Sequence, residues 1–554
     1  MSGKNPIIGL VAFLWLGACA YAPTPVSAPA TTAEAVASVK SPATAPGLLL
    51  RGKVVTMNDA GDIYPGAQLW VRGGEIMAII KAGEAVPADA SGAKVIETGG
   101  AIYPGLIDLH NHPEYAIYPL LPIPRAYKDR YEWRFYDDAY NQRITYPQVV
   151  LANADYFNLA MEIGRYGEYK ALVGGTTTLQ GGRANLPYST AECLVRNIEN
   201  TRVGAKLAAS RIDIGRDAVE WADLLKAKNS GLLVIHLAEG PSSRMATEYE
   251  SIRKSGLVGP ELIAIHGVGL TEEQFKDMAA NGVKLVWSPL SNFLLYGKTA
   301  NVAAAKRAGV NISLAPDWAP SGSKSVLGEL KVADLVNRHQ LKSLFTDRDM
   351  AFMVTRNPAR AMGWGDRVGQ ISVGFVADLL VIDDRQADPY RNLIDATEEN
   401  IRVVMVRGEP LYGDATVIGN TRSAAELEFV TDFAGKRQKV MAPNCPGSGL
   451  PLMSLAETRS RLQRGLDMDG DFLVRQGSAA KINLELARCP GGAPPAVPNA
   501  DDARRFLACR FQLPFEKTVL SPLTTNDDPD FMARLLANPN LPGYLKALPE
   551  YYRK

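Results

Sequence analysis

Histidine is scarce in this chain, and its placement is unusual. The 554 residues include five histidines, and four of them stand at or just beyond the carboxyl end of an apolar, strand-like run: His110, His112, His236 and His266. Asp317 follows the last run of this kind. A single strand-end histidine would as readily be a hydrogen-bonded core residue. The complete set, closed by an aspartate, has the ligand chemistry of a zinc-type ion and predicts one metal site.

The spacing of the first two histidines supports this interpretation. His110 and His112 lie two residues apart on an extended segment, so their side chains project to the same side. Glu239 lies three residues after His236, where the strand gives way to a loop. A carboxylate there can transfer protons, provided that it is not itself a ligand. The alternative is a solvent-facing glutamate. His339 falls in a polar helical segment, and we assign it a structural role.

Parallel strands would bring the four histidines and Asp317 together at the carboxyl-terminal edge of one sheet. Residues 101–364 alternate apolar runs with amphipathic helical patterns, which indicates βα units. An α/β fold with a (β/α)8 TIM barrel follows from this alternation over about 260 residues, and such barrels carry their sites at the carboxyl ends of the strands. Seven strands are predicted, with the eighth unassigned: 101–108, 172–179, 205–212, 232–236, 262–266, 283–287 and 312–315.

Two local signals fix helix starts within this region. The stretch from Thr271 to Gln274 has the pattern of a capping box, and the helix that follows is predicted to end near Gly282. Asn357 followed by Pro358 predicts an N-cap with proline at the first helical position.

Short β segments flank the predicted barrel. They lie at 48–56, 68–72 and 75–80, with Gly73 and Gly74 as a hairpin turn, and again at 369–374, 378–382 and 403–406. We therefore predict one composite β-sandwich made from residues 48–100 and 365–423. Residues 424–554 form a C-terminal extension to which the sequence assigns no role.

The N-terminus has the features of an export signal. Residues 1–18 combine Lys4 with an apolar run too short to span a bilayer. The run ends in a sequence that resembles a bacterial lipobox, which predicts a lipidated Cys19 and attachment to the membrane. Cleavage after Ala20 is the alternative. Residues 19–47 are rich in Ala, Pro, Thr and Ser and are predicted to be a flexible tether. We expect an exported protein of the bacterial cell envelope or periplasm.

Composition narrows the class of partner. The formal charge is +1, and no basic block or basic amphipathic stretch stands out, which argues against a nucleic-acid partner and leaves a small molecule as the expected substrate. Cys193 is interpreted as a small buried apolar residue. Cys445, Cys489 and Cys509 cluster late in the chain, and one disulfide is expected among them, with the pair left open.

Seven motifs in order carry a family resemblance. The chain resembles the amidohydrolase superfamily, within it the branch of cytosine, guanine and adenosine-type deaminases and triazine hydrolases, over about 48–420. The motifs are the segments 104–112, 236–239, 265–267, 288–292, 314–317, 357–363 and 374–379.

The resemblance implies a role for each site residue. His110, His112, His236 and Asp317 would hold a single Zn²⁺, with Fe²⁺ as the alternative. His266 would orient the attacking water or polarise the substrate, Glu239 would pass a proton to the leaving nitrogen, and Asp317 would accept a proton from the water. The reaction implied is attack of metal-activated hydroxide on an sp² carbon bearing nitrogen.

One metal is favoured over two. Binuclear members of the superfamily commonly bridge their ions through a carboxylated lysine at a strand end. We find none between residues 170 and 232, because Lys206 sits at the start of its segment.

Departures from the family pattern concern the substrate. Trp318 follows Asp317, where many relatives carry a small residue, and would reshape the pocket mouth. The aromatic-rich stretch 115–140 would form a lid or pack on the surface. Deamination of a heterocycle and hydrolysis of a cyclic amide or amidine both fit. An exported linear amidase or peptidase-like enzyme, and an inactive metal-binding lipoprotein, are the alternatives.

Overall fold

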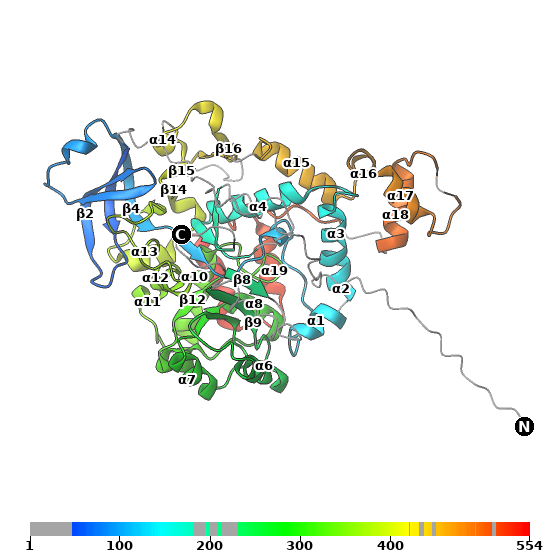
Figure 1. The fold of residues 1–554 in the computed structure, drawn as a ribbon, viewed down its shortest axis with the longest axis horizontal. Helices are drawn as coiled ribbons and strands as arrows, with labels where there is room; N and C mark the ends of the chain where they lie inside the picture. The colour runs from blue at the N-terminus through cyan, green and yellow to red at the C-terminus, as the bar shows by residue number, and fades with distance from the viewer. Residues whose placement is uncertain are drawn as a thin grey trace, which may run out of the picture. The chain divides into compact units, whose positions relative to one another are not determined.

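The computed structural model describes residues 47–136, 138–181, 194–199, 208–211, 231–419, 421–430, 437–445, 450–493, 495–511 and 517–553 (Figure 1). Contacts divide the chain into two units, 1–39 and 40–554, and every described residue belongs to the second. The predicted leader, Cys19 and all of the predicted tether except Gly47 lie outside the described residues, as do Cys193 and Lys206.

The strands of the described chain form three sheets. Those of the largest sheet are β1 (Leu48–Val55), β2 (Ile63–Arg72), β3 (Glu75–Ile80), β4 (Lys94–Pro104), β13 (Leu379–Asp383), β14 (Ile401–Val406), β15 (Glu409–Asp414), β16 (Glu428–Val430) and β17 (Lys439–Met441). The parallel strands are β5 (Leu106–Asp108), β6 (Thr176–Leu179), β7 (Arg196–Asn197), β8 (Ala208–Arg211), β9 (Leu232–Leu237), β10 (Leu262–His266), β11 (Lys284–Trp287) and β12 (Ile312–Leu314).

The largest sheet combines strands from both flanking segments. Its order is β16-β17-β15-β14-β13-β4-β1-β2-β3, so β13 from the later segment pairs with β4 from the earlier one. Gly73 and Gly74, at φ 61° and 85°, make the predicted hairpin turn between β2 and β3, a backbone conformation that glycine adopts without steric cost. Because β4 leads into β5 through Gly105 alone, this sheet adjoins the strand that precedes His110.

Eight parallel strands carry the site, in the orders β5-β6-β7 and β8-β9-β10-β11-β12. The fold is therefore α/β, as predicted. All six residues of β9 and all five of β10 are buried, which explains why both strands are apolar apart from one histidine each, since a strand covered on both faces shows no alternation. An isolated parallel bridge joins Asn111 to Asp317, just beyond the ends of β5 and β12.

Three predicted strands need correction. Residues 101–108 contain two elements, because β4 ends at Pro104 in the large sheet and β5 begins at Leu106. Residues 172–173 belong to the end of helix α4, so that β6 begins only at Thr176. Residues 369–374 form no strand, and Gly369 and Gly374 have positive φ values that interrupt an extended ladder. The strand left unassigned from sequence is β7, which has two residues.

Helices connect and cover the parallel strands. Their bounds are α1 (Arg130–Tyr136), α2 (Asp138–Tyr140), α3 (Tyr146–Ala152), α4 (Ala160–Val173), α6 (Ser243–Lys254), α7 (Glu272–Ala280), α8 (Pro289–Tyr296), α9 (Val302–Ala308), α10 (Val326–His339), α11 (Asp347–Phe352), α12 (Arg356–Ala361), α13 (Pro389–Asp395), α14 (Ala415–Ile418), α15 (Leu455–Leu466), α16 (Gly470–Gln476), α17 (Ala479–Leu486), α18 (Ala500–Phe511) and α19 (Pro529–Ala537). Short helical turns are η1 (Ala88–Ala90), η2 (Pro113–Tyr115), η3 (Asn141–Thr145), η5 (Glu398–Asn400), η6 (Ala424–Glu426) and η7 (Gly543–Tyr552).

One of the two helix-start predictions is correct. Thr271 caps α7, its hydroxyl accepting from Gln274 N while Gln274 bonds back, which confirms the capping box. The N-cap prediction at Asn357 is wrong, because α12 begins at Arg356 after Thr355. The Asn357 amide instead donates to Ile312 O at 2.9 Å, so a contact between elements uses the side chain that would have capped the helix.

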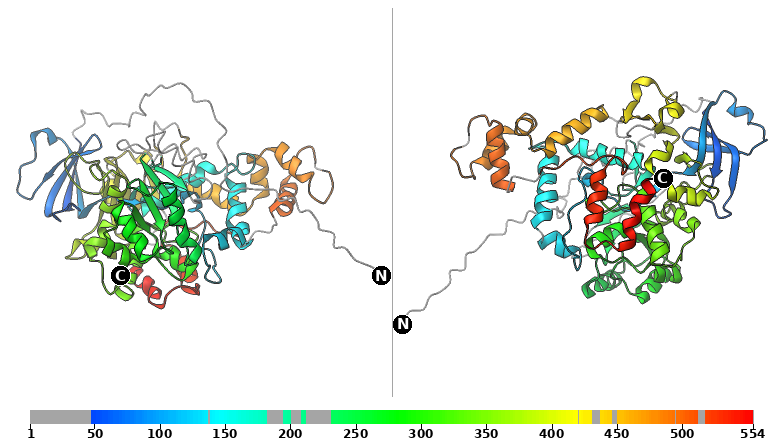
Figure 2. Two further views of the ribbon diagram at one scale, coloured as in Figure 1. Left: turned by 60° about the horizontal axis from the view of Figure 1, so that its bottom comes forward. Right: turned by 180° about the vertical axis from the view of Figure 1, so that it is seen from behind.

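The C-terminal extension returns to the body of the protein. It supplies β16 and β17 to the large sheet, and η7 packs against α10 (Figure 2). Ser521 N donates to Ile117 O at 3.0 Å, and Arg534 donates to Leu120 O at 3.0 Å. Both acceptors belong to the loop that follows His112, and the extension therefore supports that loop.

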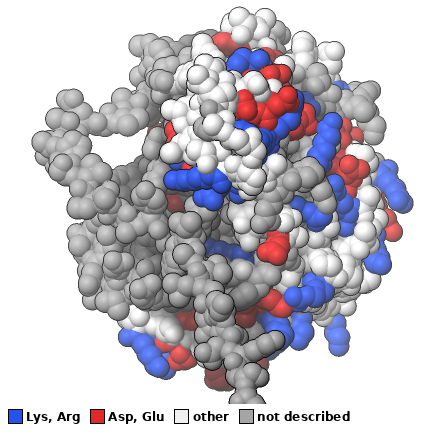
Figure 3. All heavy atoms as spheres, turned by 90° about the vertical axis from the view of Figure 1, so that its right-hand side faces the viewer, with Lys and Arg blue, Asp and Glu red and all other residues white. Residues whose placement is uncertain are grey.

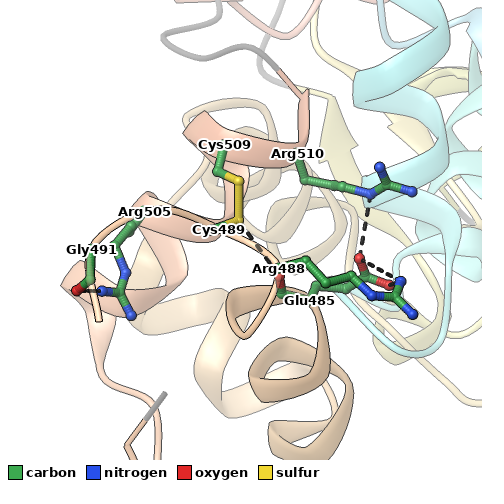
Figure 4. The surroundings of a disulfide bond; sticks show 7 residues. All are labelled: Glu485, Arg488, Cys489, Gly491, Arg505, Cys509 and Arg510. Atoms are coloured by element: carbon green, nitrogen blue, oxygen red, sulfur yellow. Dashed lines mark hydrogen bonds and ion pairs between the residues drawn. A yellow bond between two sulfur atoms is a disulfide. The ribbon is translucent and has the colours of Figure 1, made fainter. Parts of the chain in front are cut away.

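A disulfide joins two helical segments of the extension. Cys489, after α17, is bonded to Cys509 in α18, which confirms the expected single bridge among the last three cysteines (Figure 4). Cys445 is disulfide-bonded as well. Beside the bridge, Arg510 lies 3.3 Å from Glu485 in α17, so an ion pair spans the same two helices (Figure 4).

Acidic and basic side chains are interspersed on the described part of the face drawn in Figure 3. None of the described helices combines the length and the apolar character that crossing a bilayer requires.

Candidate metal centre

The five predicted residues meet at the carboxyl ends of the parallel strands. His110 and His112 follow β5, His236 lies within β9, His266 ends β10, and Asp317 follows β12. His110, His236, His266 and Asp317 are buried and offer ligand atoms that all lie within 4.8 Å of one another. His112, whose side chain is 18% exposed, lies beside them.

The shortest contacts favour the predicted set of four ligands. His110 Nε2 lies 3.2 Å from His236 Nε2 and 3.1 Å from Asp317 Oδ1. His112 Nε2 lies 3.3 Å from His236 Nε2 and 3.6 Å from the same Asp317 oxygen. Ligands about 2.0–2.1 Å from a tetrahedral ion are about 3.4 Å apart. These four atoms have that spacing, whereas the shortest contact of His266 Nε2 with Asp317 is 4.0 Å, to Oδ2.

The charge states also suit a cation. Burial lowers the pKa of His110 to about 3, and burial with the neighbouring histidines lowers the pKa of His236 well below its ordinary value. Neutral imidazoles offer lone pairs, and in this site they stand beside a carboxylate. Nitrogen lone pairs that face each other at 3.2 Å repel unless a cation lies between them, and the donor set therefore fits a divalent ion.

Neighbouring side chains orient the donors. Ser288, immediately after β11, bonds His110 Nδ1 at 2.8 Å, leaving Nε2 directed at the other donors. Ser291 in α8 donates to Asp317 Oδ2 at 2.6 Å. Asp108 accepts from His110 N and from the Asn111 amide, and burial raises the pKa of its carboxyl to about 8. Hydrogen bonds of this kind, from neighbouring side chains to the ligand residues, fix the orientation of the ligands.

His266 has a separate arrangement. Its Nδ1 donates to Asn292 Oδ1 at 2.9 Å, so that Nε2 carries the lone pair. That Nε2 is buried and has no hydrogen-bond partner among the described residues. Burial lowers the pKa of this ring to about 3, which keeps it neutral. A neutral ring with an unused acceptor can bind a water or a substrate N–H.

The backbone is strained at the same strand ends. His266 and Asp317 have φ values of 70° and 72°, and Ala238, beside Glu239, has 51°. Non-glycine residues seldom adopt this left-handed conformation, and those that do are found in turns and at functional sites. In this chain the left-handed conformations at these strand ends direct the side chains of His266, Asp317 and Glu239 toward one another.

Glu239 faces His266 rather than solvent, which excludes the solvent-facing alternative. It is 3% exposed, and its Oε2 lies 3.5 Å from His266 Nε2. Burial raises the pKa of its carboxyl to about 8, although nearby Arg130 acts in the opposite direction. A carboxyl group that keeps its proton near neutral pH can donate that proton to a leaving group.

The aromatic residues noted in the sequence form a wall beside the donors. Trp318 stacks on Trp133, with ring centroids 5.6 Å apart, and meets Tyr115 edge to face at 5.3 Å. Tyr140 packs edge to face on Trp133 at 5.0 Å. Tyr115 also lies 6.3 Å from the His112 ring, centroid to centroid. Part of the stretch 115–140 thus joins the site instead of only packing on the surface.

Sequence reasoning missed Tyr296 and gave no role to Asn292. Both lie on α8, four residues apart and therefore on one helical face. Asn292 reaches His266, and the Tyr296 hydroxyl donates to Glu239 Oε1 at 2.6 Å. The i, i+4 spacing after the segment 288–292 was the available signal. His339, at the end of α10, stacks on Tyr544 and takes no part in the donor group.

Comparison with known proteins matches the chain to the amidohydrolase family. A model of the amidohydrolase family matches residues 101–411. A 5-methylthioadenosine/S-adenosylhomocysteine deaminase of Syntrophobacter fumaroxidans is 25% identical over 426 residues, which cover 67% of this chain and 94% of that protein. A 5'-deoxyadenosine deaminase of Methanothermobacter thermautotrophicus is 31% identical over 227 residues, covering 38% of this chain and 52% of the relative.

Solved structures share the fold. An adenosine deaminase from Xanthomonas campestris with bound zinc superposes with a TM-score of 0.53 at 20% identity, covering 66% of this chain and 92% of its own. A mutant of an atrazine chlorohydrolase from Arthrobacter aurescens, complexed with zinc and atraton, gives a TM-score of 0.55 at 18% identity, covering 66% of this chain and 95% of its own.

Proposed function

The chain belongs to the amidohydrolase family, and from that premise we propose that it deaminates a planar heterocyclic amine. It is a hydrolase of carbon–nitrogen bonds other than peptide bonds, and it depends on a divalent metal. The observation that carries the narrower proposal is the position of Glu239. Its buried carboxyl stands between Tyr296 and His266, beside the donor group, where a departing amine requires a proton.

Each residue has a task in this reaction. His110, His112, His236 and Asp317 would hold one ion, with zinc favoured and iron as the alternative. When bound, such an ion lowers the pKa of a water and supplies positive charge for a developing oxyanion. His266 Nε2 orients the water or the substrate, and Asp317 Oδ2, held by Ser291, accepts a proton. The water oxygen adds to the ring carbon as its proton passes to Asp317, Glu239 Oε2 protonates the amino nitrogen, and the C–N bond breaks to release ammonia and the hydroxylated ring. Return of the proton from Asp317 to Glu239 then restores both carboxyl groups.

The aromatic wall supports a planar substrate. Trp133 and Trp318 present ring faces and edges beside the donors, and flat heterocycles gain from such contacts. The curated relatives described above are named as deaminases of adenosine-type compounds. Hydrolysis of a cyclic amide or amidine uses the same attack and is the second candidate within this proposal.

An ammonia-release screen tests the reaction. Purified protein would be offered adenosine, 5'-deoxyadenosine, cytosine and guanine, together with cyclic amides and linear dipeptides, with a Glu239→Gln preparation as the blank for contaminating deaminases. We expect ammonia from at least one heterocyclic amine. Acid formed from a cyclic amide without ammonia would replace deamination by ring opening, and activity on dipeptides alone would refute both.

We also propose that the eight parallel strands belong to one closed barrel spanning 101–364, with a β-sandwich formed by 48–100 and 365–423 to which the C-terminal extension adds β16 and β17. The bridge from Asn111 to Asp317 and the 3.0 Å bond from Asp317 N to His110 O support a junction between the first and last strands.

For the N-terminus we propose export with lipidation of Cys19, on the sequence features alone. Mass spectrometry of the mature N-terminus, from protein expressed in a bacterial host, tests this. We expect a chain that starts at a lipidated Cys19, and a Cys19→Ser variant that leaves the membrane fraction. A start after Ala20 without lipid would support ordinary cleavage, and an uncleaved chain would refute export.

A further inference from the structure

The two oxygens of the Glu239 carboxyl have different partners. Oε1 accepts from the Tyr296 hydroxyl at 2.6 Å, and Oε2 lies 3.5 Å from His266 Nε2. The Tyr296 oxygen also accepts from the Trp133 indole N–H at 2.9 Å. A hydrogen-bonded chain therefore runs from the aromatic wall to the carboxyl that faces the donor group.

The hydrogen-bonding chemistry of the three side chains determines which group donates at each step of this series of hydrogen bonds. The indole nitrogen of Trp133 can only donate, so the Tyr296 oxygen must accept there. Among the described residues, Glu239 Oε1 is the acceptor left for the phenol hydrogen. Because Oε1 receives that hydrogen, the transferable proton of Glu239 resides on Oε2, the oxygen directed at His266.

The segment that carries Trp133 is fixed to the loop that carries Glu239. Arg130 N donates to Glu239 O at 3.1 Å, and Ser242 N donates to Lys128 O at 3.1 Å. A Cβ added to Gly240 would lie 2.4 Å from Asp129 Cα, so this crossing leaves room only for glycine.

Buried side chains reinforce the crossing. The Arg130 guanidinium binds both oxygens of Glu248, at 2.7 and 2.9 Å, while Glu248 Oε2 accepts from Ala238 N at 2.8 Å. Paired, bidentate contacts of this kind hold a fixed geometry. The Trp133 segment is thus a fixed wall and not a separate lid.

We propose that Tyr296 is a positioning residue that holds the proton of Glu239 on the oxygen facing the substrate, and that Trp133 sets the direction of the Tyr296 hydroxyl. This inference rests on the proposed function, because it assigns Glu239 as the proton donor. Trp133 then has two separable roles: its ring forms the wall with Trp318, and its N–H orients the proton donor.

The variants separate these roles. Tyr296→Phe removes the hydroxyl and keeps the ring, and Trp133→Phe keeps an aromatic surface and removes the N–H. The matched control is Tyr249→Phe, which deletes a similar bond from a tyrosine hydroxyl to a carboxylate, the 2.7 Å bond to Asp277 between α6 and α7. All three would be checked for metal content and thermal midpoint before kinetics.

The kinetic prediction concerns kcat and the leaving group. For an amine substrate found in the ammonia screen, Tyr296→Phe should lower kcat about 10- to 100-fold, with KM and metal content unchanged. For an analogue with chloride at the same ring carbon the loss should be much smaller, because chloride leaves without a proton. Trp133→Phe should lower kcat less and also raise KM. Equal kcat in Tyr296→Phe and Tyr249→Phe would overturn the proposal, as would equal losses on amine and chloride.

A crystal structure tests the positioning role of Tyr296 even if the proposed reaction is not observed. In a crystal structure of Tyr296→Phe, the Glu239 carboxyl should turn to a new or second orientation. An unchanged single orientation would show that Tyr296 does not position it. If the wild type releases no ammonia from any amine, the proposed function fails, and this structure still tests the positioning role.

Discussion

Asn292 fixes the ring of His266: the 2.9 Å bond from His266 Nδ1 to Asn292 Oδ1 requires a proton on Nδ1 and leaves the lone pair on Nε2. The free nitrogen then points toward Glu239 and Asp317. The side chain that sets this tautomer comes from α8, the helix that also provides Tyr296.

Replacing Asn292 should therefore impair turnover. Asn292→Leu loses the acceptor, and we expect kcat to fall about 10- to 100-fold, the usual effect of removing a residue that orients a site histidine. Asn292→Asp keeps an acceptor and should retain more activity. Steady-state kinetics with metal analysis makes the comparison. If Asn292→Leu had the wild-type kcat, Asn292 would have no role in setting the tautomer.

Substitution of the proton donor should separate metal binding from turnover. Glu239→Gln keeps the shape of the side chain but cannot supply the proton, so kcat should fall about 100- to 10,000-fold. Metal content measured by plasma mass spectrometry should match the wild type, because Glu239 lies outside the four ligands. An active variant would exclude the proton-transfer role, and loss of the ion would instead make Glu239 a ligand.

Removal of the ion should destabilise the protein. We expect about one ion per chain, and dialysis against a chelator should abolish activity and lower the thermal midpoint, since an ion present at 100 times its Kd contributes about 2.7 kcal/mol to the free energy of unfolding. One equivalent of zinc should restore both properties.

Two histidine variants identify the ligand set. His112→Ala should lose the ion, and His266→Ala should keep it but lose activity. The opposite result would favour the alternative group of His110, His236, His266 and Asp317. Two ions per chain would contradict the mononuclear assignment.

Acid should weaken the attachment of the C-terminal extension at Asp334. Burial raises the pKa of this carboxyl, but hydrogen bonds from Arg391 and from Tyr551 of η7 lower it further, so that the net shift is downward. Because the pKa of Asp334 is lower in the folded state than the unfolded-state pKa of about 3.9, its ionised carboxylate stabilises the folded protein at pH values above that unfolded-state pKa. This contribution to the free energy of unfolding is lost as the pH falls through the folded-state pKa.

Asp334→Asn should therefore have a lower thermal midpoint than the wild type at neutral pH, and the difference should shrink below about pH 4. Asp501→Asn, at a side chain that is 89% exposed, is the control and should change the midpoint little at any pH. A difference that stays constant down to pH 3 would argue against a charge-dependent attachment.

The sequence predicted the parts of the site that depend on buried parallel strands. β9 and β10 are apolar apart from their site histidines and end within one residue of their predicted positions, and these histidines meet as expected. A run of this kind can be recognised in one sequence, because burial on both faces leaves no room for polar residues.

Other features carry no such signal. β7 has two residues, which is too short for any periodicity. Asn357 fits an N-cap by residue type, but a contact with Ile312 uses its side chain. The bond from Trp133 to Tyr296 joins positions 163 residues apart, and no local pattern in the sequence records it.

The contacts of Ser521 and Arg534 with the loop after His112 affect the order in which parts of the protein can fold during synthesis. A ribosome synthesises every proposed ligand by residue 317, yet the residues that support this loop emerge about 200 positions later. A nascent chain can thus gather its donors early, while the aromatic wall that includes Tyr115 acquires its support only near the end of translation. A chain truncated before residue 521 would keep every proposed ligand but would lack these contacts to the loop after His112.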